Sequence, residues 1–369
     1  MPQGVNQELQ IGLARLREFW LNQAEASFRR VLAAEPDNPA ALHLLGVAAC
    51  KLGRHAEGVA LIRRAIEIQP ERAAANFDLE VALRNPLQHG DSQGYSVDRA
   101  EHAFKLIDYQ YHARVRYGAG RAPHPELAGL MSKGRKLYAA LIAEIARFHA
   151  DFCAIALDGD YADLAPFWHN TWFPPLDGMA LHAMLCTRNP GLFLEIGSGI
   201  STKFARRAIA GHALRTRVVS IDPEPRNQID RLADRNIRAP LESVDQRVFD
   251  ELAEDDILFL DSSHRAFQNS DVTTFFLEVL PRVRPGVIVH MHDIYLPYDY
   301  PAGHLRRLWN EQYLLATALL YGGAALEVAF PCWYVSQDPE LSALTNASLR
   351  QGALAGLSVH GASFWMRKA

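Results

Sequence analysis

The stretch GLFLEIGSGISTKFARRAI, residues 191–209, decides the fold of this chain. Its apolar run at 192–194 is typical of a buried strand, and the residues after the glycines take the spacing of a helix. Gly197 and Gly199 remove side chains where the backbone turns sharply, which lets a ligand approach the N-terminus of the following helix. The stretch therefore predicts a strand, a turn and a helix that together hold a ligand.

Five further apolar runs follow, with helical segments between the earlier ones. Continuous apolar strands separated by helical crossovers are typical of a parallel sheet covered by helices on both faces. The sequence therefore predicts an α/β domain from about residue 160 onward. The predicted strands after 192–197 are RVVSID (217–222), DILFLD (256–261), GVIVHMHD (286–293), ALEVAF (325–330) and SFWMRK (363–368).

Four of these strands end in or beside a carboxylate, at Glu195, Asp222, Asp261 and Asp293. Ligands of open α/β sheets bind at the carboxyl ends of the strands. A carboxylate there costs solvation free energy unless it faces a ligand or water. The four residues together indicate a ligand site.

The glycine turn distinguishes two kinds of ligand. A dinucleotide fingerprint would place a third glycine at Thr202, so this threonine disfavours a Rossmann oxidoreductase. S-adenosylmethionine (SAM) has no phosphate but presents an ammonium, a sulfonium and a ribose diol, for which carboxylates are suitable partners. Asp222 is placed to accept from the ribose hydroxyls, and Glu195 to interact near the cationic methionine end.

These segments resemble the motifs of class I SAM-dependent methyltransferases. LEIGSGIST is similar to the glycine-rich motif, although Ser201 stands where a third glycine is common; VVSIDPEPR, DILFLDSSH and LPRVRPGVIVHMHD are similar to the second, fourth and fifth strand motifs. The resemblance covers about residues 160 to 369. It implies a Rossmann-like α/β sheet of seven strands in the order 3-2-1-4-5-7-6, with the last strand antiparallel. It also implies SAM as cofactor, bound by Glu195, Gly197, Ser198, Gly199, Ser201, Asp222 and Asp261.

Methyl transfer to a hydroxyl needs a group that removes the hydroxyl proton. His264 follows Asp261 by three residues, and His292 directly precedes Asp293. Each histidine is a candidate base, and each could equally hold a loop by hydrogen bonding. The predicted catalytic residues are His264, His292 and Asp293.

A divalent metal ion at the same strand ends is an alternative to a histidine base. In the catechol-type branch of the resembling family, Asp261 and Asp293 would bind an ion that holds two acceptor oxygens. That branch has asparagine where this chain has Ile294, so a histidine would have to complete the ligand set. The candidate metal ligands are Asp261, His264 and Asp293.

Two aromatic, proline-containing stretches flank the expected site, at 167–185 and 295–313. They are interpreted either as lids over an acceptor pocket or as segments that only bury apolar area. The first interpretation favours a small-molecule or saccharide acceptor.

An internal repeat precedes this domain. Over residues 5–85 the sequence recurs every 34 residues: Gly12 as Gly46, and Pro36 as Pro70. This period resembles the tetratricopeptide (TPR) repeat, with two repeats and the first helix of a third. An all-α TPR-like domain implies either a groove for a protein partner, or packing and self-association.

Between the two parts, 85–96 reads as a connection, and helices are predicted over 97–116 and 126–156. The expected domains are therefore residues 1–85 (TPR-like), 86–160 (connection and helical segment) and 161–369 (methyltransferase-like).

The composition indicates which partners and which cellular compartment to expect. The 369 residues carry a net charge of −4, so neither nucleic acid nor an anionic membrane is expected as a partner. Four cysteines without a CxxC pair, a polar N-terminus and the lack of a membrane-length apolar run predict a cytoplasmic protein. The alternatives to a methyltransferase are a noncatalytic TPR adaptor and, less favoured, a Rossmann oxidoreductase.

Overall fold

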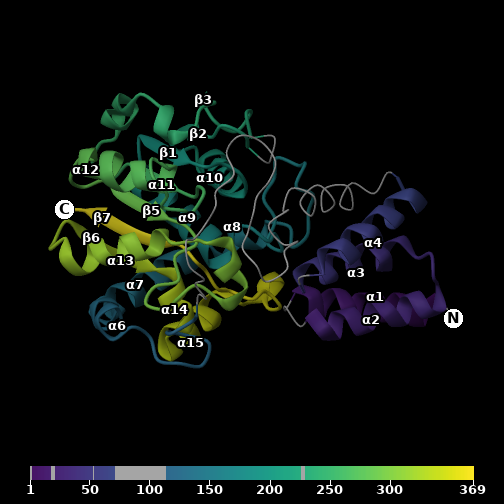
Figure 1. Ribbon diagram of the computed structural model, residues 1–369. Helices are drawn as coiled ribbons and strands as arrows, with labels where there is room; N and C mark the ends of the chain where they lie inside the picture. The colour runs from purple at the N-terminus through teal and green to yellow at the C-terminus, as the bar shows by residue number, and fades with distance from the viewer. Residues whose placement is uncertain (1, 18–20, 53, 71–113, 226–228) are drawn as a thin grey trace. The chain divides into compact units, whose positions relative to one another are not determined.

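The structure, a computed structural model, describes residues 2–17, 21–52, 54–70, 114–225 and 229–369. The chain divides into two compact units, Met1–His112 and Ala113–Ala369 (Figure 1). The domain limits expected from the sequence remain predictions. The third repeat helix lies outside the described residues, as does most of the helix predicted over 97–116, whose last three positions are not helical.

The described part of the first unit consists of four helices, coloured purple to blue in Figure 1. Helix α3 begins where the Asn38 side chain accepts a hydrogen bond from the backbone N–H of Ala41, with Pro39 in the first turn. The helices are α1 (Pro2–Arg17), α2 (Leu21–Ala34), α3 (Pro39–Lys51) and α4 (His55–Ile68). Their shared core contains Leu16, Ala24, Phe28, Leu45 and Ala48.

Two glycines 34 residues apart allow these helices to pack closely. A Cβ atom at Gly12 would lie 2.5 Å from the Phe28 ring, and one at Gly46 would lie 2.6 Å from Ile62. Both distances are far below van der Waals contact, so a larger residue would push the helices apart. The recurrence of glycine in the sequence therefore marks the same helix crossing in successive repeats.

The second unit contains a seven-stranded sheet in the order β3-β2-β1-β4-β5-β7-β6. The first five strands pair in parallel, and β7 pairs antiparallel with both β5 and β6. The predicted strand order and the antiparallel last strand are confirmed. The strands are β1 (Leu192–Ile196), β2 (Arg217–Ile221), β3 (Arg235–Ile237), β4 (Ile257–Leu260), β5 (Ile288–Met291), β6 (Leu326–Pro331) and β7 (Phe364–Lys368).

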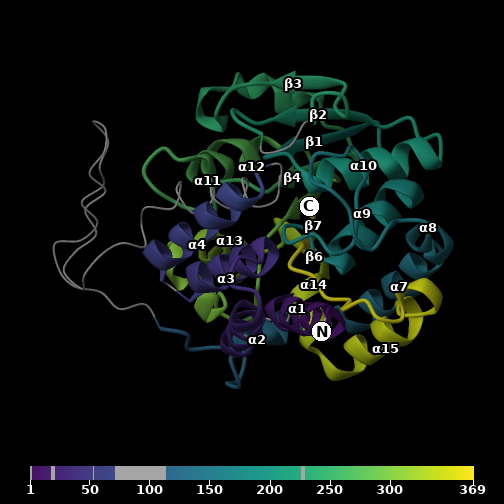
Figure 2. The same cartoon turned by 90° about the vertical axis from the view of Figure 1, so that its right-hand side faces the viewer.

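Helices cover both faces of the sheet, as Figure 2 shows. On one side lie α9 (Pro175–Arg188) and α10 (Ile200–Gly211); on the other lie α11 (Asp271–Thr274), α12 (Leu280–Arg282) and α13 (Glu311–Tyr321). No described helix has the length and apolar character needed to cross a membrane. The remaining elements are a π-helical turn (Phe275–Val279), α14 (Cys332–Gln337), α15 (Pro339–Leu349) and the 3-10 helices Leu241–Ser243, Gln246–Glu251, Ala302–Arg307 and Gly352–Leu354.

The single helix predicted over 126–156 is three helices in the structure. They are α6 (Pro125–Ser132), α7 (Arg135–Ala146) and α8 (His149–Cys153), and Gly134 separates the first two. Glycine is a poor residue inside a helix, which accounts for this interruption.

The buried face of α7 contains Tyr138, Ile142 and Ile145, whereas Leu137 on the same helix is 49% exposed.

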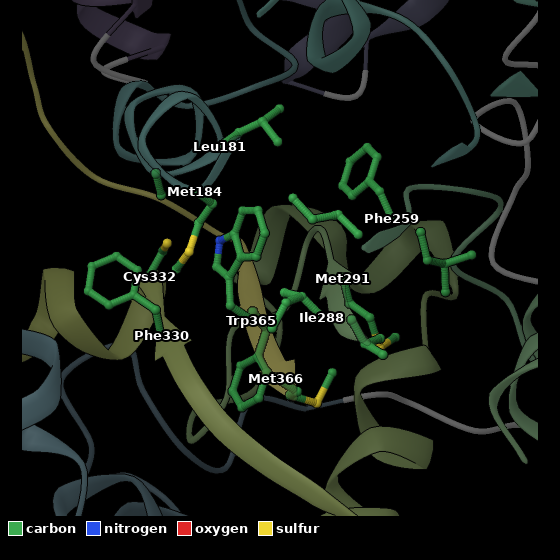
Figure 3. Close-up of a cluster of buried hydrophobic side chains, with 14 of the residues drawn as sticks. Leu181, Met184, Phe259, Ile288, Met291, Phe330, Cys332, Trp365 and Met366 are labelled. Atoms are coloured by element: carbon green, nitrogen blue, oxygen red, sulfur yellow. The ribbon is translucent and has the colours of Figure 1, made fainter. Parts of the chain in front are cut away.

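The main core lies on both faces of the sheet, and part of it is packed between the sheet and α9. Figure 3 shows the Trp365 indole of β7 next to Leu181 and Met184 of α9. On the same strand pair, the His290 ring stacks on Trp365 at 3.7 Å, and its Nε2 lies 2.7 Å from the hydroxyl of Ser363. Burial lowers the pKa of His290 well below its ordinary value. His290 is therefore a neutral core histidine.

Candidate functional site

The glycine turn after β1 lies between the tips of two neighbouring strands. The N–H of Gly197 donates to the carbonyl of Ile221, and the N–H of Asp261 donates to the carbonyl of Ile196, both at 2.9 Å. Gly197 has φ of +81°, and a Cβ atom there would lie 1.8 Å from the carbonyl oxygen of Asp261. Only glycine fits between these strand tips.

Gly197→Ala is expected to lower the free energy of unfolding by at least about 2 kcal/mol, because positive φ and a collision with backbone act together. Denaturant unfolding of the purified chain measures this change. The matched control is Gly129→Ala in α6, where an added Cβ meets nothing within 4 Å. That variant should gain up to about 1 kcal/mol. Equal stability of the two variants would contradict this account of the turn.

Glu195 lies under the turn and is fully buried. Its Oε1 accepts from the Thr202 hydroxyl at 2.7 Å, and that hydroxyl accepts from the N–H of Gly199 at 3.0 Å. Among the described residues, its Oε2 has no hydrogen-bond partner. Burial raises the pKa of Glu195 to about 8, although the hydrogen bond from Thr202 opposes this shift.

Asp222 connects the tip of β2 to the glycine turn. Its Oδ2 accepts from the N–H of Ser198 at 2.9 Å and from the Ser198 hydroxyl at 2.8 Å, and its Oδ1 accepts from the N–H of Glu224 at 2.9 Å. A carboxylate can accept about four hydrogen bonds, so this side chain retains capacity for a ligand hydroxyl.

A pocket opens beside the turn. It brings together residues of the glycine motif, the end of β4 and the aromatic stretch that precedes β1. Aromatic rings therefore form one side of the pocket, and polar groups at a helix N-terminus form another. The lining residues are Trp172, Phe173, Ser198, Gly199, Ile200, Ser201 and Asp261.

His264 lies at the far side of Asp261. Its Nδ1 pairs with the Glu311 carboxylate, and its Nε2 lies 3.4 Å from Oδ1 of Asp261 and 3.6 Å from Oδ2 of Asp293. Burial by itself would lower the pKa of His264, but the three carboxylates outweigh it and raise that pKa to about 9. The Trp309 ring lies against the imidazole at 4.3 Å.

His292 approaches the same two aspartates from beneath. Its Nε2 lies 3.2 Å from Oδ2 of Asp177, and its Nδ1 lies 3.6 Å from Oδ1 of Asp261 and 3.9 Å from Oδ1 of Asp293. Burial would lower the pKa of His292, and the carboxylates raise it well above its ordinary value. Asp177 is itself fixed, because it accepts from the backbone N–H groups of residues 362 and 363.

Two carboxylate–histidine pairs, Glu311–His264 and Asp177–His292, therefore converge on the two aspartates. We name Asp261, His264, His292 and Asp293 the cleft cluster. His264 and Asp293 also have positive φ values, +60° and +55°. Non-glycine residues held in this conformation cost about 1–3 kcal/mol and concentrate at functional sites.

The sequence interpretation missed Asp177 and Glu311. Both lie inside the flanking aromatic stretches, at 167–185 and 295–313. Asp177 interrupts apolar residues at the start of a helix, which indicates a group that must find a buried partner, whereas Glu311 lies between Asn310 and Gln312 and carries no such signal.

The cleft cluster has the composition of a metal site, since ligand atoms of Asp261, His264 and Asp293 lie within 4.8 Å of one another. The neighbouring carboxylates, however, hold His264 in its protonated form at neutral pH. A metal ligand must be neutral, so a bound ion would first have to displace this proton. Ile294, at the position of the missing asparagine ligand, is fully buried in the core.

Comparison with known proteins identifies the two parts of the chain. A family model described as a methyltransferase domain matches residues 194–294, and one described as a tetratricopeptide repeat matches residues 21–77. No curated protein matches the chain.

Among solved structures, a mutant of the Thermobaculum terrenum O-GlcNAc transferase is similar at 15% identity and a TM-score of 0.23, with 70% of this chain and 46% of that chain covered. The chain thus spans less than half the length of that protein. The two family models, together with the observed strand order, identify a methyltransferase domain preceded by an N-terminal tetratricopeptide repeat region.

Proposed function

We propose that this chain transfers a methyl group from SAM to a hydroxyl oxygen of a small molecule or saccharide. A methyltransferase domain implies SAM as the donor. The observation that carries the choice of oxygen is the convergence of two carboxylate–histidine pairs beside the pocket at the strand ends. Removal of a hydroxyl proton is the step for which such pairs are suited.

The residues around the glycine turn fit the donor. Asp222 retains hydrogen-bonding capacity for a ribose hydroxyl, and the buried Oε2 of Glu195 suits a cationic group. Ser198, Gly199 and Ser201 line the pocket at the N-terminus of α10. When bound there, SAM would supply an electrophilic methyl on sulfonium. The chain's own contribution is to hold donor and acceptor in line and to exclude water.

The aromatic residues beside the pocket support the acceptor class. Trp172 and Phe173 line it next to Asp261, and Trp309 covers the His264 ring. Aromatic walls with a few convergent polar groups suit an acceptor that joins an apolar face to hydroxyls. Saccharides and aromatic alcohols both have this character.

His264 is the base that we favour. Its side chain is 9% exposed against 1% for His292, and its Nε2 faces both aspartates. Glu311 would hold the ring and stabilise the imidazolium that forms when the hydroxyl proton arrives. His292 and Asp293 would complete the polar wall of the cleft.

The experiment incubates the full chain with SAM and a panel of hydroxylated acceptors and measures formation of S-adenosylhomocysteine. SAM binding without turnover on any acceptor would favour the noncatalytic adaptor. Binding of NAD in place of SAM, measured by calorimetry, would favour the oxidoreductase.

Asp222→Ala is expected to weaken SAM binding by about 1–3 kcal/mol, which is about 5- to 150-fold, because a charge-assisted hydrogen bond is lost. Calorimetry measures the dissociation constant. Ser198→Ala is the matched control, since it removes the hydroxyl contact to Asp222 and keeps the carboxylate. An unchanged affinity in Asp222→Ala would remove this residue from the ribose role, and an equal loss in both variants would assign it to loop support.

A divalent metal ion is a second candidate at the cleft cluster, favoured by the grouping of Asp261, His264 and Asp293. In that case the ion would orient the acceptor oxygen and lower its pKa. A chelator would then abolish turnover, and Asp293→Ala would have the same effect.

For the first unit we propose a protein-binding or self-association role. The support is the helical repeat over residues 21–77, since TPR arrays present surfaces to other proteins. Sedimentation of the full chain, with and without candidate partners, tests this role.

A further inference from the structure

A second group of metal-ligating side chains lies away from the cleft, where the ends of three helices meet. His182 and Cys186 are one helical turn apart on α9, so they share a face. His212 follows the last residue of α10, and Asp151 lies on α8. We name these four residues the helix-end cluster.

The distances within the helix-end cluster match those between ligands of one small ion. Oδ2 of Asp151 lies 3.1 Å from Nε2 of His212 and 3.6 Å from Nε2 of His182. Ligand atoms of His182, Cys186 and His212 lie within 4.8 Å of one another. Around tetrahedral zinc, bonds of about 2.0–2.1 Å place neighbouring nitrogen and oxygen ligands about 3.3 Å apart. His182, Cys186 and His212 therefore form a mutually close set, and Asp151 joins it through the two histidines.

His182 provides independent support. It is 2% exposed; its Nδ1 has no hydrogen-bond partner among the described residues, and its Nε2 has only the Asp151 carboxylate at 3.6 Å. The rings of Phe148 and Phe152 pack edge-on against it at 5.4 Å and 5.3 Å. A buried imidazole left in this state is costly unless something binds it.

Burial has opposite consequences for metal binding at the two α9 ligands, because it favours the neutral imidazole and disfavours the thiolate. Burial lowers the pKa of His182 to about 4, so its imidazole is neutral and keeps a lone pair. Burial, with Asp151 nearby, raises the pKa of the Cys186 thiol to about 12. Coordination would displace the thiol proton to solvent, which is the usual accompaniment of zinc binding.

We infer that the helix-end cluster is a structural zinc site, with His182, Cys186, His212 and Asp151 as its four ligands. On binding, bonds from zinc to two nitrogens, one sulfur and one oxygen replace its bound waters, and the thiol proton leaves to solvent. Two nitrogens, one thiolate and one carboxylate give a neutral complex with Zn²⁺. Four protein ligands close the coordination sphere, as in structural sites.

Such a site would connect the helices that position the cleft. Helix α9 carries Asp177 in its first turn, and α10 begins at the glycine turn. Zinc would join the opposite ends of these two helices to α8. The inference does not depend on the proposed methyl transfer.

The test uses the purified full chain, stripped of metal by a chelator and titrated with Co²⁺ as the probe. Wild type should bind Co²⁺ with tetrahedral ligand-field bands and a thiolate-to-cobalt charge-transfer band, and Zn²⁺ should displace it. The charge-transfer band is diagnostic, because the cleft cluster contains no sulfur ligand. Absence of this band in wild type would overturn the site.

Cys186→Ser should lose the charge-transfer band, and the matched control Cys153→Ser, on neighbouring α8, should keep it. Loss of a residue that only supports a ligand weakens metal binding by about 10- to 100-fold. His212→Gln removes a ligand itself, so it should weaken Co²⁺ binding by more than this. His212 is at the protein surface, so this variant tests the site even if changes at His182 prevent folding. A band that persists in Cys186→Ser, or unchanged affinity in His212→Gln, would refute the assignment.

Discussion

His264→Ala is expected to lower kcat by about 10²–10⁴-fold while changing SAM affinity little, because the base that accepts the hydroxyl proton is removed. The ring is buried, and its Nε2 lies 3.4 Å from Asp261 and 3.6 Å from Asp293. Steady-state rates of S-adenosylhomocysteine formation measure the loss. His292→Ala gives a second reading, since its Nδ1 faces the same aspartates.

The matched control is His360→Ala, an exposed histidine outside the cleft, which should retain full activity. If proton removal needs no metal, the rate of wild type should survive a chelator. A chelator effect that disappears in Cys186→Ser would report the helix-end cluster, and one that persists in Cys186→Ser would report a metal in the cleft. Full activity in both His264→Ala and His292→Ala would end the catalytic assignment.

Much of the sheet could be predicted, because buried parallel strands are continuous apolar runs bounded by turns. The run at 192–197 and the carboxylates at strand ends placed Asp222, Asp261 and Asp293 at one edge. The residue pattern alone does not predict β3, because only one of its three residues, Arg235–Ile237, is apolar. It is recognised by its pairing with β2.

The supporting carboxylates could not be predicted in the same way. Asp177 and Glu311 contact histidines 115 and 47 residues away in the sequence. No local spacing connects such residues, so only the folded chain shows that each histidine has its own carboxylate. The helix-end cluster has the same character, since only His182 and Cys186 are close in sequence.

The pH dependence of the rate should reflect the carboxylates that surround His264. Because the carboxylates raise the pKa of His264 to about 9, only about one in a hundred molecules has the neutral base at pH 7. Turnover should therefore rise between neutral pH and about pH 9. The same shift stabilises the fold below the unfolded-state pKa of about 6.5, and this contribution is lost as the pH rises through about 9.

Glu311→Gln is expected to lower kcat at the wild-type optimum by about 10²-fold or more, since loss of the orienting carboxylate costs about 10⁴-fold in Ser-His-Asp enzymes. It should also move the rising limb of the pH profile down by about one to three pH units, because an opposite charge beside His264 is removed. Asp261 and Asp293 remain and limit this movement. The measurement is kcat against pH for both proteins.

Glu340→Gln is the matched control, because this exposed glutamate pairs with Arg135 far from the histidine in sequence. It should leave both the rate and the pH profile unchanged. If Glu311 only maintained packing, Glu311→Gln would leave the rate and the profile nearly unchanged, since an amide of the same shape fills the same space. If the midpoint of the rising limb of kcat against pH stayed fixed in Glu311→Gln, the assignment of His264 as the base would be contradicted. A shift of this midpoint to lower pH would show that the rising limb reports deprotonation of His264.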